Sequence, residues 1–116
     1  MFTELLSSCV PKCTQEELNP ILVEKLRYFL CFLRFEPTIT SAYRSPGYER
    51  SKGRKGDSSH CNGLAVDISA IDSHIRYKIV SAALQAGFPR IGIGKNFVHL
   101  DIDETKAHPI IFHYYD

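Results

Sequence analysis

The segment 97–103 constrains the fold most, because apolar and polar side chains alternate along it without a break. Side chains two residues apart in a β-strand share one face of the sheet. One face of this strand is apolar and is formed by Val98, Leu100 and Ile102. The opposite face carries Phe97, His99, Asp101 and Asp103. The segment therefore predicts a strand with the core on one side and either a solvated surface or a functional site on the other.

Two segments have the apolar spacing of amphipathic helices. The first runs from Pro20 to about Arg34, and Asn19 can cap its N-terminus with Pro20 in the first turn. The second runs to Ala86 after Asp72, which can serve as its N-cap. The two helices are long enough to cover one face of a small sheet.

Three further strands are expected at residues 38–43, 64–68 and 90–94, and the tail after residue 102 is expected only to pack as an extension. Helices and strands do not alternate as they do in a Rossmann fold. The sequence thus predicts one α+β domain over residues 1–116, with a small, mostly antiparallel sheet and two main helices packed on it.

Residues 44–63, between two of these strands, are polar and glycine-rich, with no recognisable helix or strand. Loops of this length in compact domains are usually functional or disordered. Part of this loop is a basic run, Arg50, Lys52, Arg54 and Lys55. The run could contact nucleic-acid phosphates or form a solvated surface.

The charge balance excludes several classes of partner. Fourteen Lys and Arg residues stand against thirteen Asp and Glu, a net charge of +1, which argues against a nucleic-acid coat or polyanion binder. An aromatic content of 11% at this net charge is not a disordered composition. No apolar run approaches the roughly 18–20 residues of a membrane span, so no membrane partner is expected. The first residues show no secretory signal, so we expect synthesis in the cytoplasm without a signal peptide.

Without a secretory signal, the four cysteines are expected to be reduced thiols, with Cys31 a small core residue. The spacing of Cys9 and Cys13 could also provide half of a metal site.

His60 and Asp67 can join the polar face of the strand that carries His99. Gly63 permits a turn between the loop with His60 and the strand with Asp67. A buried carboxylate is costly unless a cation or hydrogen bonds compensate it. A zinc ion held by His60, Asp67 and His99 would do so, and three protein ligands leave the open position of a catalytic zinc site. The spacing alone also fits a solvated strand face.

Three strings in the chain are more specific. They are T-S-A-Y-R-S-P at residues 40–46, S-S-H-C-N-G-L-A-V-D-I at 58–68 and G-I-G-K-N-F-V-H-L-D at 92–101. Together they resemble the zinc D-Ala-D-Ala carboxypeptidases and the L-alanyl-D-glutamate endopeptidases of phage endolysins. These cell-wall peptidases share an antiparallel-sheet fold with the hedgehog signalling domain. The resemblance covers roughly residues 16 to 104.

The resemblance implies one Zn²⁺ per chain, with His60, Asp67 and His99 as its ligands. It also implies that Arg44 binds the scissile carbonyl oxygen, and a fixed guanidinium can stabilise the oxyanion of a tetrahedral intermediate. The residues that we expect to contact the substrate are Tyr43, Ser58 and Asn96.

Asn96 departs from the family pattern. Many relatives carry an Asp or Glu general base three residues before the last histidine ligand, and an amide cannot take a proton from water. Asp101 is the nearest carboxylate on the strand face of His99. It can serve as the catalytic base, or it can accept a ring N–H of a zinc-bound histidine and brace it, which is the role we favour.

The leading hypothesis is a zinc metallopeptidase that hydrolyses peptide bonds in the stem peptides or cross-links of bacterial peptidoglycan, as a carboxypeptidase or an endopeptidase. One alternative is a zinc-bearing but inactive relative that binds a peptide or protein, and another is a nucleic-acid-binding module or nuclease that uses the basic run. A phage or prophage origin suits the leading hypothesis. The enzyme would then reach the cell wall after release or as a virion or lysis component.

Overall fold

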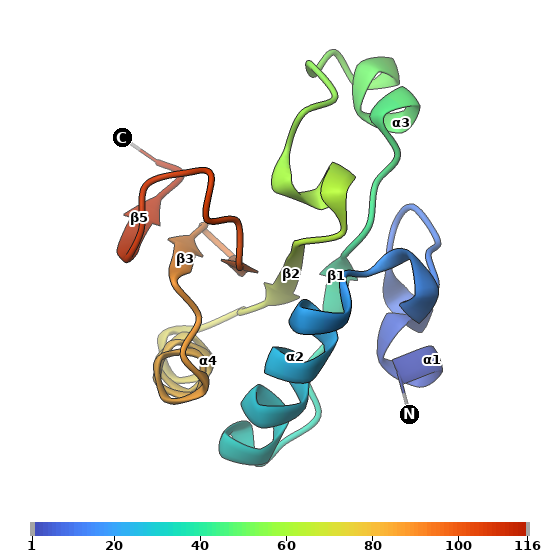
Figure 1. Ribbon diagram of the computed structural model, residues 1–116. Coiled ribbons are helices and arrows are strands. Elements are labelled where there is room, and N and C mark those ends of the chain that lie inside the picture. The colour runs from blue at the N-terminus through green and yellow to red at the C-terminus, as the bar shows by residue number, and fades with distance from the viewer. Residues whose placement is uncertain (1, 116) are drawn as a thin grey trace.

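Two long helices and a five-stranded sheet dominate the computed structural model, which describes residues 2–115 (Figure 1). The α-helices are α1 (Phe2–Leu5), α2 (Pro20–Leu33), α3 (Pro46–Ser51) and α4 (Ser73–Ala86). Short 3₁₀ turns are η1 (Leu6–Ser8), η2 (Gln15–Glu17) and η3 (Ser59–Asn62). The strands are β1 (Ile39–Ser41), β2 (Ala65–Ser69), β3 (Arg90–Ile93), β4 (Phe97–Asp101) and β5 (Ile110–His113). The predicted α+β class is confirmed.

Both long helices begin at the caps that the sequence indicates. The Asn19 side chain accepts a hydrogen bond from the Ile21 amide at 2.8 Å, and the Asp72 side chain accepts one from the Ile75 amide at 2.8 Å. Helix α4 ends at Gly87, whose φ of 83° places it in the left-handed region. None of the helices in residues 2–115 is long and apolar enough to cross a membrane.

The core lies between the two long helices and one face of the sheet. Many of its fully buried side chains come from α2, α4, β2 and β4, and they include Leu22, Leu26, Phe29, Ile79, Val66, Ile68, Val98 and Leu100. Each such apolar side chain stabilises the fold by about 1.5–3 kcal/mol relative to an exposed one. The apolar face predicted for the strand at residues 97–103 is therefore the core face.

The expectation that Cys31 is a core residue is wrong, because its side chain is exposed. Helix α2 buries the stripe that contains Leu26, Phe29 and Leu33. At about 100° per residue, Cys31 lies on the far side of the helix from Phe29. The apolar run along this helix is wider than the face that it buries.

The strands are ordered β1-β2-β4-β3-β5, and the first three pairings in this order are antiparallel. Strand β5 pairs in parallel with β3, so the sheet is mixed rather than purely antiparallel. The tail, expected only as a packed extension, thus adds an edge strand. In the central antiparallel pairs, His99 lies opposite Asp67 on one side and opposite Gly92 on the other.

Residues 44–63 have more structure than the sequence predicts, because they contain α3 and η3. Ser45 caps α3 by accepting a hydrogen bond from the Tyr48 amide at 3.0 Å, and Pro46 occupies the first turn. The segment projects from the sheet on the side away from α2 and α4 (Figure 1). It returns to β2 through Gly63, which has a φ of 68° and no room for a Cβ, since that atom would lie 2.5 Å from the Glu17 carbonyl oxygen.

Candidate metal centre

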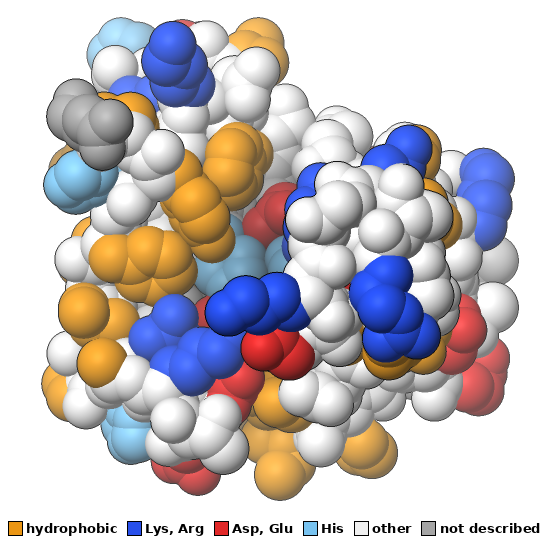
Figure 2. Space-filling model, turned by 90° about the horizontal axis from the view of Figure 1, so that it is seen from above, with side chains coloured by type: hydrophobic (Ala, Val, Ile, Leu, Met, Phe, Trp, Pro, Cys, Tyr) orange, Lys and Arg blue, Asp and Glu red, His pale blue; other side chains and the backbone are white. Residues whose placement is uncertain are grey.

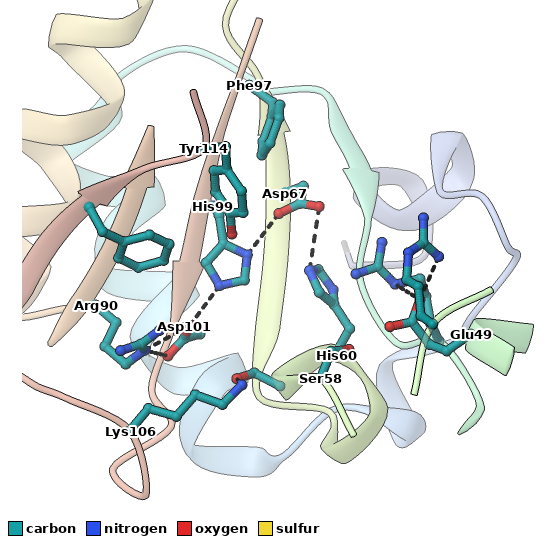
Figure 3. A pocket seen from close by; sticks show the side chains of 14 residues that line it. Glu49, Ser58, His60, Asp67, Arg90, Phe97, His99, Asp101, Lys106 and Tyr114 are labelled. Carbon is teal, nitrogen blue, oxygen red and sulfur yellow. Dashed lines mark hydrogen bonds and ion pairs between the residues drawn. The ribbon is translucent and has the colours of Figure 1, made fainter. Parts of the chain in front are cut away.

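His60, Asp67 and His99 come from η3, β2 and β4 and converge on one point of the polar sheet face (Figure 3). Each offers one ligand atom, and these atoms lie within 4.8 Å of one another. The in-register pairing of Asp67 with His99 brings the two strand residues together. The turn at Gly63 then places His60 beside them. The structure thus brings together the three residues that the sequence predicts as zinc ligands.

A backbone carbonyl fixes the orientation of His60. Its Nδ1 lies 2.6 Å from the Ala42 carbonyl oxygen, so this ring nitrogen is the protonated donor. The other ring nitrogen, Nε2, faces Asp67 at 3.4 Å from Oδ2. The lone pair of Nε2 therefore points at the shared centre.

A carboxylate fixes His99 in a corresponding way. Its Nε2 lies 2.6 Å from Asp101 Oδ2, and its Nδ1 lies 2.9 Å from Asp67 Oδ1. Asp101 is fully buried and also accepts hydrogen bonds from the Asp103 amide at 3.0 Å and from Arg90 Nε, 3.1 Å from Oδ2. Because its oxygens are engaged by three partners, Asp101 holds the ring of His99 in place and leaves Nδ1 directed at the centre.

The electrostatics of the cluster suit a cation. Burial alone would raise the pKa of Asp67, but hydrogen bonds and charge interactions with His60 and His99 hold the pKa of this carboxyl well below its usual range. Burial alone would lower the pKa of His99, but its bonds to Asp101 and Asp67 raise it. Two imidazole nitrogens and one carboxylate oxygen are a donor set that zinc prefers. The residues present therefore fit a zinc ion.

The cluster lies at the floor of an open cleft of about 410 Å³. Figure 2 looks into this hollow, with histidine and acidic side chains at its floor and hydrophobic side chains gathered along one side. One wall comes from α3 and the chain on either side of it, and we call Arg44, Glu49 and Arg54 the charged wall. Opposite it lie Phe97, Phe112 and Tyr114, which we call the aromatic wall.

A buried carboxylate organises the charged wall. Glu49 Oε2 lies 2.7 Å from Arg54 Nη1 and 3.2 Å from Arg44 Nε. Burial opposes the charge of Glu49, but the Ser58 hydroxyl and the two guanidinium groups hold the pKa of its carboxyl below the usual value. Arg44 also donates from Nη1 to the Ser41 hydroxyl at 3.2 Å, whereas its buried Nε–H is aligned with no acceptor in the described residues.

The other sequence-predicted residues occupy different places. Ser58 lines the cleft, as Arg44 and Asp101 do. Tyr43 is half-buried and packs against the core, and Asn96 is exposed at the turn before β4, with its carbonyl bonded to the Ala70 amide at 2.9 Å. Neither Tyr43 nor Asn96 lines the cleft. Their predicted contacts with substrate stay predictions.

Sequence reasoning did not single out several cleft residues, namely Glu49, Arg90, Lys106, Phe112 and Tyr114. Glu49 lies among basic residues in a loop where no periodic pattern marks it. Phe112 and Tyr114 are two residues apart, which is the spacing of one strand face. This spacing is the signal that could have placed them together.

The profile of the peptidase M15 family matches residues 8–101 of the chain. The match includes the three cluster residues and the charged wall, and it ends at Asp101, before β5 begins. A search of curated proteins gave no match.

Proposed function

The chain belongs to the peptidase M15 family, and from this premise we propose that it is a zinc-dependent hydrolase of peptide bonds in bacterial peptidoglycan. The observation that carries the proposal is the convergence of His60, Asp67 and His99 at the floor of an open cleft. In both histidines, the ring nitrogen that points away from the centre is already bonded to a protein acceptor. Such bonds orient metal ligands before the metal binds.

The residues of the cluster would hold zinc through His60 Nε2, a carboxylate oxygen of Asp67 and His99 Nδ1. When bound there, zinc supplies a Lewis acid that polarises a carbonyl and lowers the pKa of water to near 7. The cleft leaves the cluster open on one side, where a peptide can approach.

Arg44 is the residue that we propose to bind the reacting carbonyl oxygen. Its side chain is mostly buried in the cleft wall, and Glu49 and Ser41 limit its movement. Charge that develops on the carbonyl oxygen is stabilised best by a donor that is already in position. Arg44 lines the cleft that contains the metal cluster, so its guanidinium can meet a carbonyl oxygen there.

For Asp101 we propose the bracing role rather than the role of catalytic base. A base must be free to take a proton, but Asp101 is fully buried and bonded to His99, Arg90 and the Asp103 amide. These donors lower the pKa of its carboxyl although burial opposes them. The carboxylate therefore fixes His99 and stays ionised.

The charge of the cleft supports an anionic peptide as the substrate. Cationic side chains outnumber carboxylates among the residues that line it, with Arg44, Arg54, Arg90 and Lys106 against Glu49, Asp67 and Asp101. Bound zinc would add further positive charge. Peptidoglycan stem peptides carry free carboxylates, which such a cleft attracts. The site of action would then be the cell wall.

The departure at Asn96 favours a second candidate, a zinc-bearing relative that binds a peptide without cleaving it. One experiment separates the two. The zinc-loaded protein is incubated with purified peptidoglycan, and the released fragments are identified by mass spectrometry, with a His60→Ala variant as the metal-site control. New peptide termini made by the wild type alone support the peptidase. Binding of stem peptide without new termini supports the second candidate.

A further inference from the structure

We propose that Tyr114 is a further catalytic residue, whose hydroxyl donates a hydrogen bond to the reacting carbonyl oxygen from the wall opposite Arg44. The inference rests on the proposed peptidase function. It concerns a residue directly after β5, beyond the part of the chain that the family profile matches.

Tyr114 stands directly beside the metal centre. Its ring centroid is 6.1 Å from that of His99, at an interplanar angle of 69°. Figure 3 shows the ring next to His99, with the hydroxyl directed toward the cluster rather than away from it. A carbonyl that is polarised at the cluster would then lie on the side that this hydroxyl faces.

The backbone and two neighbouring rings hold Tyr114 in this position. Its amide donates to the Ile93 carbonyl oxygen at 3.0 Å, which continues the pairing of β5 with β3. Its ring centroid lies 5.2 Å from that of Phe97 and 5.4 Å from that of Phe112. The packed rings restrict the rotation of the Tyr114 side chain on one side, while the residue as a whole is 52% exposed.

The absence of a side chain at Gly92 leaves space for these rings. A Cβ at Gly92 would lie 2.8 Å from ring atoms of both Phe112 and Tyr114. Gly92 is also the β3 residue directly opposite His99. The rings therefore lie against bare backbone beside a metal-ligand strand, and any larger residue would push them away from it.

The Tyr114 hydroxyl takes part in none of the hydrogen bonds among the described residues, so the fold does not use it as a structural anchor. A fixed donor that faces a reaction centre needs no reorganisation when charge develops there. Hydrolysis adds water to the carbonyl carbon and later breaks the carbon–nitrogen bond, and the carbonyl oxygen carries negative charge in between. Tyr114 would stabilise this oxygen by a hydrogen bond and keep its own proton throughout.

The test compares Tyr114→Phe with Tyr115→Phe. Tyr115 is the neighbouring tyrosine, which packs on His113 and does not line the cleft. For Tyr114→Phe we expect kcat to fall roughly 100-fold, as for loss of an oxyanion donor. KM, zinc affinity and melting temperature should be unchanged. A phosphinic peptide, which mimics the tetrahedral state, should bind the variant roughly 100-fold more weakly by calorimetry. Tyr115→Phe should match the wild type in every measurement.

A second variant, Gly92→Ala, tests the position of the ring while keeping the hydroxyl. It should lower kcat and phosphinic-peptide affinity, with zinc still bound.

Unchanged kcat and phosphinic-peptide affinity in Tyr114→Phe would overturn the inference while leaving the peptidase proposal intact. Loss of zinc or of folding in Tyr114→Phe would also overturn it, because the residue would then be structural. A wild type that neither cleaves peptidoglycan nor binds the phosphinic peptide would overturn the proposed function, and the inference with it.

Discussion

The charged wall and the aromatic wall face each other across one cleft, but different forces hold them in place. In the charged wall, Glu49 is buried and holds the guanidinium groups of Arg44 and Arg54 by ion pairs. The aromatic wall is held by ring packing against the backbone of β3 at Gly92. Ion pairs fix the position of a charged group, whereas ring packing fixes the shape of the cleft wall. Arg44→Ala should therefore remove a charge from the charged wall, whereas Gly92→Ala should change the shape of the aromatic wall at constant charge.

The largest loss of activity should come from Arg44→Ala in the charged wall. We expect kcat to fall by roughly 100-fold or more, since a fixed donor to the reacting oxygen is lost. Zinc content should be unchanged, because Arg44 is not a ligand. Rates on a stem peptide and zinc per chain are the measurements.

Arg54→Ala is the matched control for Arg44→Ala, because Arg54 pairs with the same carboxylate but is about half exposed. Its loss should change kcat little. Equal losses in the two variants would show that the wall acts only through its total charge.

Asp101→Asn tests the metal cluster at the floor of the cleft, between the two walls. Without the carboxylate, the Nε2–H of His99 loses its charged acceptor, and we expect zinc affinity to fall about 10–100-fold. Activity should return when zinc is in excess. Chelator competition gives the affinity, and an assay at saturating zinc gives the activity.

If the Asp101→Asn variant is inactive at full zinc occupancy, Asp101 is instead the catalytic base. The same carboxylate also binds Arg90, whose guanidinium lies over the Phe112 ring at 4.9 Å. Asp103→Asn is a control for general destabilisation, because Asp103 is buried beside this site without a bond to His99.

Zinc binding should depend on pH through the metal cluster and not through either wall. In the metal-free protein the pKa of His99 is raised, so below that pKa the ring carries a second proton, which zinc must displace. Zinc affinity should be independent of this group above that pKa and fall about tenfold per pH unit below it. Chelator competition between about pH 5 and 8 measures this.

The walls should not titrate over the same pH interval. The pKa of Glu49 is lowered, so it stays ionised, and the pKa of Tyr114 is raised by burial and by the nearby charges of Asp67 and Asp101, so it stays protonated. A zinc affinity that does not change with pH would contradict the raised pKa of His99.

Sequence reasoning predicted the structural elements for which a single residue pattern decides the structure. The long helices follow from caps and periodicity, and the two faces of β4 follow from strict alternation. The convergence of His60, Asp67 and His99 followed from a string that resembles a known family, together with a turn at Gly63. The spacing of the three residues alone did not distinguish a site from a solvated surface.

The aromatic wall could not be predicted in the same way. Strand β5 is short and mostly exposed, and the spacing of Phe112 and Tyr114 is too brief a pattern to predict a strand by itself. Its partner β3 lies far from it in the chain, so the pairing is decided by tertiary contacts that local patterns do not record. Helix α3 was also missed, although Ser45 and Pro46 are a helix-start signal inside a loop that reads as irregular.

The strand order has a consequence for local opening of the protein. Strands β2 and β4 carry Asp67 and His99 inside the sheet, and β4 is hydrogen-bonded on both sides. Strand β5 is the last in the order and pairs only with β3 among the described strands, whereas β1 at the other edge has a further bond from the Val10 amide to the Thr40 carbonyl oxygen at 3.1 Å. Amide hydrogen exchange should therefore be slowest in β4 and faster in β5. Fraying at β5 would displace Tyr114 and open the aromatic wall while the strands that carry the metal ligands stay paired.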